Sequence, residues 1–184
     1  MSDSPSDILV IHDGGLPALV AAVSALERAS ANQRVHAWCP PEGSALVPKD
    51  APAWSSRVSF VQQQATLLGL GEVIEAAALP QMEDTTKASA AWPQDRNMDV
   101  AQELLRASAR AARLNCSKVI WPVVCGGDLD AVFTASEQAQ LITRLIELDQ
   151  EPKGVAIETP LADLSWRQLT TLASELDVPL TETW

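Results

Sequence analysis

The stretch ILVIHDGGLPALVAAVSAL, from Ile8 to Leu26, decides the fold of this 184-residue chain. It opens with a short apolar run rich in β-branched residues, which predicts a central strand over 7–12. Two glycines follow, and the next apolar segment predicts a well-buried helix over 16–29. Pro17 falls in the first turn of that helix, where its missing N–H costs nothing. A strand that turns through glycines into a helix is a corner at which many proteins bind a phosphate.

The rest of the chain repeats this alternation of strand and helix. Two capping boxes, TASE at 134–137 and SWRQ at 165–168, mark helix starts, and Gly69 or Gly71 is a plausible helix end. Further strands are predicted over 33–39, 72–77, 117–124 and 154–160, and further helices from 55 to Gly69 or Gly71 and over 98–114, 134–149 and 165–176.

This alternation predicts a Rossmann-like, doubly wound parallel sheet of about five strands, with helices on both faces. We expect one α/β domain over 7–184 after a disordered lead-in at 1–6. Ligands of such sheets bind outside the carboxyl ends of the strands, where the strand order reverses. The long connection at 78–95 lacks periodicity, and loops of this kind are often functional or mobile.

The composition excludes several classes of partner. With 24 Asp and Glu against 13 Lys and Arg, the net charge is −11, so neither a nucleic-acid surface nor an anionic membrane surface is expected. No apolar run approaches the ~20 residues of a membrane span. The polar, acidic start is not a signal peptide, and three scattered cysteines indicate reduced thiols in a cytoplasm. They are predicted to be small buried hydrophobes.

Two C-terminal stretches resemble a known family. RNMDVAQELLRASARAARLNCSKVIWPVVCGGDLDAVFTASEQAQLI begins at Arg96, and IETPLADLSWRQLTTLASELDVPLTETW ends at Trp184. Together they resemble the 7-cyano-7-deazaguanine synthase (ExsB-type) family, in which an Arg-Asn pair opens a helix and an acidic residue follows the next strand. The resemblance is specific over about 96–184 and weaker over 8–30, and over 31–95 it is a fold pattern only.

This resemblance implies a member of the ATP-pyrophosphatase superfamily, with the adenine nucleotide α-hydrolase-like (HUP-type) fold. The family activates a carboxylate by adenylation and then adds ammonia. The resemblance implies a nucleotide site formed by the first corner, the matching Arg-Asn pair and the matching acidic residue. A glycine pair next to that acidic residue could let a ligand approach the backbone. The candidate nucleotide-binding residues are Asp13, Gly14, Gly15, Arg96, Asn97, Gly126, Gly127 and Asp128.

The first corner departs from the family's Ser-Gly-Gly-x-Asp-Ser loop. Here it reads Asp13-Gly14-Gly15-Leu16-Pro17-Ala18, so both serines and the inner aspartate are lost. Asp13 places a carboxylate where a phosphate should rest. Two like charges ~4 Å apart repel by about 1 kcal/mol in water and about 4 kcal/mol at an effective dielectric near 20. Alternatively Asp13 caps the helix, where an acid is favourable.

Two other departures from the family pattern also remove groups that the family's chemistry uses. Trp166 replaces a family lysine, and the chain stops at Trp184, where the family continues to a zinc-binding cysteine cluster. No zinc site is therefore expected, and catalytic residues are left unassigned.

Several residues keep two interpretations. Asn97 caps a helix beside a solvated Arg96, or the pair lies near a nucleotide. Asp128, with Asp130, is a turn residue or a cleft residue that could hold Mg²⁺. His12 is a packed strand-end histidine or a base. Trp38, Trp92 and Trp121 fill the core or a homodimer face, or stack on an adenine.

Three functional hypotheses follow. The leading one is a degenerate relative of the synthase, without adenylation activity, that acts as an adenine-nucleotide-binding or interaction domain. Its ligand would be AMP, or ATP with Mg²⁺, and the chain would form a homodimer. The second is an active ATP-dependent ligase in which Asp13 helps to hold Mg²⁺. The third is a structural oligomer with an empty cleft.

Overall fold

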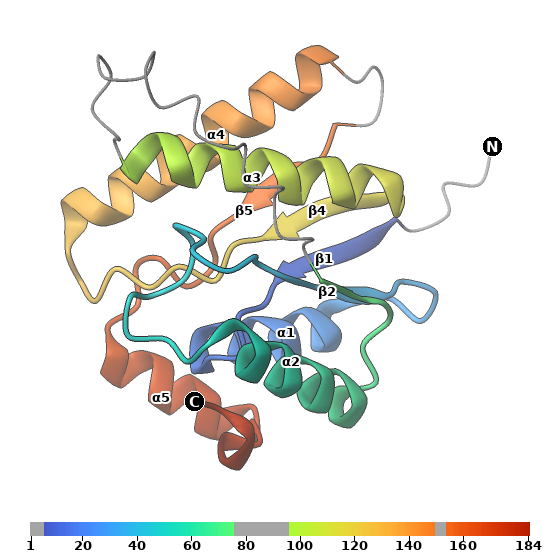
Figure 1. The fold of residues 1–184 in the computed structure, drawn as a ribbon, viewed down its shortest axis with the longest axis vertical. Coiled ribbons are helices and arrows are strands. Elements are labelled where there is room, and N and C mark those ends of the chain that lie inside the picture. Colours follow the sequence, from blue (N-terminus) through green and yellow to red (C-terminus); the bar gives the residue numbers. More distant parts are fainter. Residues whose placement is uncertain (1–5, 76–95, 150–153) are drawn as a thin grey trace.

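The computed structural model describes residues 6–75, 96–149 and 154–184. Within these ranges strands and helices alternate along the chain (Figure 1). The strands are β1 (Asp7–Ile11), β2 (Val35–Cys39), β3 (Val73–Glu75), β4 (Cys116–Ile120) and β5 (Ala156–Glu158). The helices are α1 (Leu16–Arg28), α2 (Trp54–Leu68), α3 (Arg96–Arg113), α4 (Leu129–Asp149) and α5 (Trp166–Glu175), followed by a 3₁₀ turn, η1 (Leu180–Glu182).

The five strands form one parallel sheet in the order β3-β2-β1-β4-β5. The chain runs outward from β1 through β2 to β3, and then returns to add β4 on the other side of β1. α3 and α4 cover one face of the sheet, while α1, α2 and α5 lie on the other (Figure 1). The predicted doubly wound α/β fold is therefore confirmed, and its switch point lies between β1 and β4.

The central strand β1 shows why the sheet is buried on both faces. Leu9 and Ile11 pack with α3 and α4, whereas Ile8 and Val10 pack with α1 and α5. Alternate side chains of a strand point to opposite faces, so a continuous apolar run is required here.

Two of the predicted helix starts are wrong. α3 begins at Arg96, so Asn97 lies in its first turn rather than at its cap. α4 begins at Leu129, five residues before the predicted capping box. The Asp128 carboxylate accepts hydrogen bonds from the N–H groups of Asp130 (3.0 Å) and Ala131 (3.2 Å). An acid at this position also favours the helix dipole, so the helix starts early and encloses Thr134.

Other local predictions are confirmed. Ser165 and Gln168 form the reciprocal capping box of α5. Gly69, rather than Gly71, ends α2 in the left-handed conformation, with φ of 65°. Cys39 and Cys116 are buried, and Cys125 is partly buried. Trp38 and Trp121 are core residues, whereas Trp92, the lead-in at 1–5 and the connection at 78–95 lie outside the described residues.

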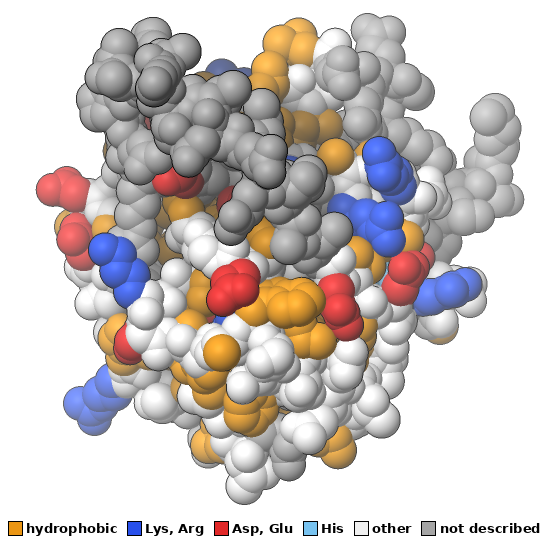
Figure 2. Space-filling model, in the orientation of Figure 1, with side chains coloured by type: hydrophobic (Ala, Val, Ile, Leu, Met, Phe, Trp, Pro, Cys, Tyr) orange, Lys and Arg blue, Asp and Glu red, His pale blue; other side chains and the backbone are white. Residues whose placement is uncertain are grey.

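The surface reflects the acidic composition. Figure 2 shows Asp and Glu side chains on either side of a group of hydrophobic side chains near the centre of this face. An anionic ligand that approaches such a face meets like charge, and salt screens that repulsion only in part.

Candidate functional site

A crevice lies at the carboxyl ends of β1 and β4, which is where the fold predicts a ligand site. Its volume is about 330 Å³. Parts of the first corner, the loop after β2, the loop after β4 and the start of α5 line it. The lining residues are Ile11, Asp13, Pro17, Ala18, Ala45, Leu46, Val47, Pro48, Trp121, Pro122, Val123, Val124 and Trp166. We call this cavity the β1–β4 crevice.

The β1–β4 crevice is apolar except at one point. Asp13 is the one ionisable side chain among its lining residues, and the indole rings of Trp121 and Trp166 contribute two aromatic surfaces. Ligand pockets of this kind are mostly apolar with a few polar groups that fix orientation. The lining suits a flat aromatic ring and supplies no cation for a phosphate.

The glycine corner has its N–H groups directed at side chains of the corner itself. The N–H of Gly15 donates to Asp13 Oδ1 at 2.9 Å, and the N–H of Gly14 donates to His12 Nδ1 at 3.3 Å. In a phosphate loop such N–H groups would face the anion. Asp13 is not the N-cap of α1, since Gly15 holds that position; its carboxylate instead stabilises the turn that leads to the cap.

Burial raises the pKa of the Asp13 carboxyl. The hydrogen bond from Gly15 and the nearby positive charge of Arg57 act in the opposite direction and offset part of that rise. The charged carboxylate is therefore favoured by one hydrogen bond and by the through-space attraction of Arg57, and an added phosphate would compete with it for both.

The side of the corner that faces away from the crevice is packed. Trp184 donates from Nε1 to the Asp13 carbonyl at 3.1 Å, and Gln64 donates from Nε2 to the Gly14 carbonyl at 3.0 Å. A Cβ atom on Gly14 would lie 3.0 Å from Phe60 Cβ, and one on Gly15 would lie 3.3 Å from the Trp184 ring. The two glycines therefore allow close packing of the protein's own side chains.

His12 is a packed strand-end residue, which is the first of its two interpretations. It is 0% exposed, and within the described residues its Nε2 atom has no hydrogen-bond partner. Burial lowers the pKa of the imidazole to about 4. Its Nδ1 accepts a hydrogen bond, so Nε2 carries the proton of the neutral ring. His12 does not line the crevice.

Three further predicted residues, Gly126, Gly127 and Asp128, lie in the described part of the chain but do not line the crevice. Gly126 and Gly127 have φ of 66° and 90° and form the turn after β4. A Cβ on Gly126 would lie 3.8 Å from the Trp166 ring, but neither glycine lines the crevice, nor does Asp128, which caps α4. Arg96 and Asn97 open α3, and their side chains lie outside the described residues.

Side chains that could hold a metal ion are not clustered in the part of the chain that the structure describes. Over 6–75, 96–149 and 154–184 no three His, Cys, Asp or Glu side chains are grouped to hold a metal ion. Asp128 is engaged in capping, which leaves Asp13 as the lone carboxylate at the crevice. A magnesium ion there would depend mainly on phosphate oxygens of a nucleotide.

Several residues near the site were not predicted, but one had a signal. Trp54, Val58, Val61 and Ala65 mark the apolar stripe of α2, and Arg57 lies on that same stripe. A lone cation at a core-facing position is unusual, and Arg57 is indeed 2% exposed. Trp184 and the 45–48 segment had no comparable signal in the sequence. They reach the site only when distant parts of the chain pack together in the fold.

The five-stranded parallel α/β fold of this chain is similar to that of solved structures. One similar structure is the U34-tRNA thiolase NcsA from Methanococcus maripaludis with its 4Fe–4S cluster, at 13% identity and a TM-score of 0.59. That match covers 96% of this chain and 59% of the thiolase chain. Another is the NH3-dependent NAD synthetase from Campylobacter jejuni in complex with the nitrate ion, at 18% identity, a TM-score of 0.52 and coverage of 98% and 68%.

These likenesses concern the fold alone. No protein-family model matches the sequence, and no curated protein matches it. The chain spans about three fifths of the length of the thiolase that it resembles. Among the described helices, none is both long and apolar enough to span a bilayer.

Proposed function

We propose that this protein is a degenerate relative of the ATP-dependent 7-cyano-7-deazaguanine synthases that binds an adenine nucleotide or nucleoside without adenylating a substrate. The observation that carries the proposal is the 2.9 Å hydrogen bond from the Gly15 N–H to the Asp13 carboxylate. The carboxylate held by this hydrogen bond places a negative charge in the otherwise apolar β1–β4 crevice.

The ligand preference follows from the lining of the β1–β4 crevice. Trp121 and Trp166 supply aromatic surface for a purine, and the apolar residues of the 45–48 segment enclose it. The Asp13 carboxylate repels a polyphosphate, by about 1 kcal/mol per charge pair in water and more when partly buried. We therefore expect adenosine and AMP to bind more tightly than ATP.

Thermal unfolding with adenosine, AMP, ATP and ATP with Mg²⁺ tests this proposal. A ligand present at ~100 times its Kd adds about 2.7 kcal/mol to the unfolding free energy, which for this chain length means a shift of several degrees. Trp166→Ala should reduce the adenosine shift, whereas the matched exposed change Leu180→Ala should not. Absence of any shift at millimolar ligand would overturn the proposal.

An assay of pyrophosphate release separates this proposal from an active ligase. If Mg²⁺-ATP stabilises the protein most and pyrophosphate is released, the altered loop is catalytic and Asp13 holds magnesium. If adenosine and AMP stabilise it and no pyrophosphate forms, the binding function stands.

A second candidate function is assembly into a homodimer, and one feature of α4 favours it. Ala135, Ala139, Ile142 and Ile146 face the core, while large apolar side chains are exposed on the opposite side of the helix. These exposed residues are Leu129, Phe133, Leu141, Leu145 and Leu148. Such an apolar face is typical of an interaction surface.

Light scattering after size exclusion tests the homodimer. Leu141→Glu combined with Leu145→Glu should convert a dimer to a monomer without lowering thermal stability much. Matched changes at the exposed polar positions Gln63 and Thr66 of α2, away from this face, should leave the dimer intact. A monomeric wild-type chain at high micromolar concentration would contradict this second function.

A further inference from the structure

A second cavity opens at the amino end of α2. Its volume is about 290 Å³. It is separated from the β1–β4 crevice by Val47 and Pro48, which line both cavities. Its lining residues are Glu42, Gly43, Ser44, Val47, Pro48, Lys49, Ala51, Pro52, Ala53, Trp54 and Arg57. We call this cavity the α2 pocket.

The floor of the α2 pocket is a buried guanidinium. Arg57 is 2% exposed, and its Nη2 donates to the Pro41 carbonyl at 3.3 Å. Within the described residues its Nη1 has no hydrogen-bond partner, and no carboxylate lies within 4.0 Å of the group. A charge removed from water without a partner is unfavourable, so this arginine is built to meet an anion.

Asp13 is close enough to feel Arg57 but does not pair with it. The positive charge of Arg57 acts on the Asp13 carboxyl through space, yet the two side chains form no ion pair within the 4.0 Å limit. Asp13 Oδ1 is instead occupied by the Gly15 N–H. Nη1 of Arg57 therefore has no partner among the described residues, and it belongs to a side chain that lines the α2 pocket.

Other donors converge on the same cavity. Trp54 Nε1 is buried and has no hydrogen-bond partner among the residues that the structure describes. α2 starts at Trp54 behind Ala53, an N-cap residue that makes no side-chain hydrogen bond, and its first turn has no acidic residue. Helix N–H groups and the helix dipole there favour an anion. Lys49 is exposed at the rim, and Glu42, also exposed, is the one acidic lining residue.

We propose that the α2 pocket binds the oxyanion group, carboxylate or phosphate, of a small molecule. The fork of Arg57 offers paired N–H donors, which match the two oxygens of such a group. Trp54 Nε1 and the start of α2 supply further donors, and Val47, Pro48 and Pro52 give an apolar wall for the rest of the ligand. This site is distinct from the β1–β4 crevice and does not depend on nucleotide binding there.

Titration with inorganic phosphate and with acetate, at constant ionic strength in chloride, tests the site. Thermal unfolding and calorimetry should show saturable binding of at least one of the two anions to the wild-type chain. Arg57→Gln should weaken that binding by tenfold or more, since charge-assisted hydrogen bonds are lost. Arg57→Lys should retain part of it. The better anion identifies the ligand as a phosphate or a carboxylate.

Control variants give the test its specificity. Arg28→Gln, at the exposed end of α1, and Trp166→Ala, in the β1–β4 crevice, should leave anion binding unchanged. Trp54→Phe keeps the packing but removes the indole N–H, so it should weaken binding several-fold. If Arg57→Gln does not fold, anion binding by Trp54→Phe and Lys49→Gln is measured instead. Weaker binding than in the wild type supports the proposal, and unchanged binding in both variants contradicts it.

Two results would overturn the proposal. One is the absence of saturable binding of either anion by the wild-type chain. The other is equal stabilisation of the wild type and of the Arg57 or Trp54 variants, which is the result of a general salt effect. A loss of adenosine binding with intact anion binding would count against the proposed function alone.

Discussion

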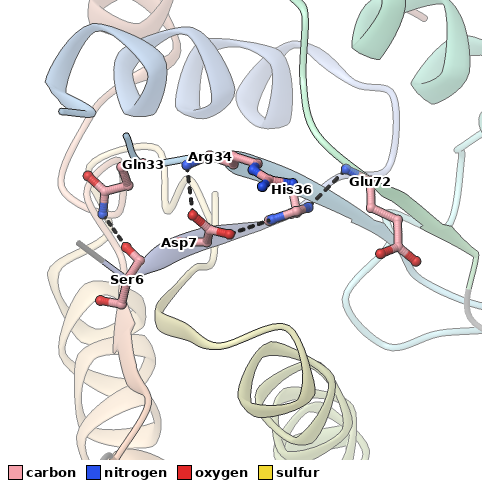
Figure 3. A network of polar contacts seen from close by, with 6 residues as sticks. All are labelled: Ser6, Asp7, Gln33, Arg34, His36 and Glu72. Atoms are coloured by element: carbon pink, nitrogen blue, oxygen red, sulfur yellow. Dashed lines mark hydrogen bonds and ion pairs between the residues drawn. The ribbon is translucent and has the colours of Figure 1, made fainter. Parts of the chain in front are cut away.

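The two histidines of this chain lie at opposite ends of the parallel strands, and their rings differ in their hydrogen bonds. His36, near the amino ends of the strands, has both ring nitrogens engaged: Nδ1 accepts from the Glu72 N–H at 2.9 Å, and Nε2 lies 3.2 Å from Asp7 Oδ2 (Figure 3). His12, at the carboxyl end of β1, leaves Nε2 without a partner in the described residues.

The polar groups around the two histidines also differ in whether their hydrogen bonds are satisfied. Figure 3 shows the amino-edge network, in which hydrogen bonds link β1, β2 and the chain after α2. Its members are Ser6, Asp7, Gln33, Arg34, His36 and Glu72. At the carboxyl edge Arg57 and Trp54 have buried donor atoms that find no partner in the described part of the chain. Satisfied polar groups stabilise a fold, whereas unsatisfied ones cost stability, so the carboxyl edge is where a ligand would act.

The largest expected effect concerns His12 and pH. Its folded-state pKa, about 4, lies below the ordinary value of 6.5, so the unfolded chain binds the proton more tightly. The unfolding free energy should therefore fall by about 3 kcal/mol as pH drops from about 7 to 4. Urea unfolding of the wild type and His12→Gln at several pH values measures this; equal slopes for the two proteins would contradict the assignment.

The next effect concerns Asp7 in the amino-edge network. Burial opposes its ionisation, but the Arg34 N–H and the His36 ring together hold the pKa of the carboxyl below its ordinary value. Asp7→Asn should cost about 2 kcal/mol at pH 7, and the cost should vanish as pH falls through the lowered pKa. Glu137→Gln, an exposed change on α4, serves as the control in chemical denaturation. A cost that does not vary with pH would refute this account.

A smaller effect is expected at Trp184, which packs against the glycine corner. Trp184→Ala removes one hydrogen bond and the ring contact with Gly15, and should lower the unfolding free energy by about 1 kcal/mol. Adenosine affinity should not change, because Trp184 does not line the β1–β4 crevice. A strong effect on adenosine affinity would show that the two sides of the corner are coupled.

The smallest effect is expected for Asp13→Ser in nucleotide binding. Removal of the carboxylate frees the Gly15 N–H and relieves like-charge repulsion of about 1 kcal/mol, so ATP affinity should rise about fivefold. Calorimetry with ATP measures it, and Glu27→Ser on the exposed end of α1 is the control. Unchanged affinity in the Asp13 variant would count against the repulsion.

Local patterns along the chain were enough to predict the fold. The alternation of apolar runs with capped helices implied a parallel sheet, and the sheet is present with the expected switch point. Element boundaries were harder, as α4 shows: Asp128 and the TASE box are both valid helix starts. The helix begins at Leu129 because the Asp128 carboxylate accepts hydrogen bonds from the N–H groups of Asp130 and Ala131.

The candidate site was predicted only in part. Asp13, which lines the crevice, could be predicted because strand, turn and helix are adjacent in sequence. Arg57 was missed because its burial depends on the loop after β2, which closes over it.

The amino-acid sequence alone was sufficient for the parallel sheet, the glycine corner and the acidic surface, since these depend on periodicity, on backbone freedom and on charge. It could not tell where the corner's N–H groups point or what closes its far side. Asp13 and Trp184 are 171 positions apart and meet at 3.1 Å. Contacts of that range, and the burial of Arg57, exist only after the whole sheet and its helices have packed.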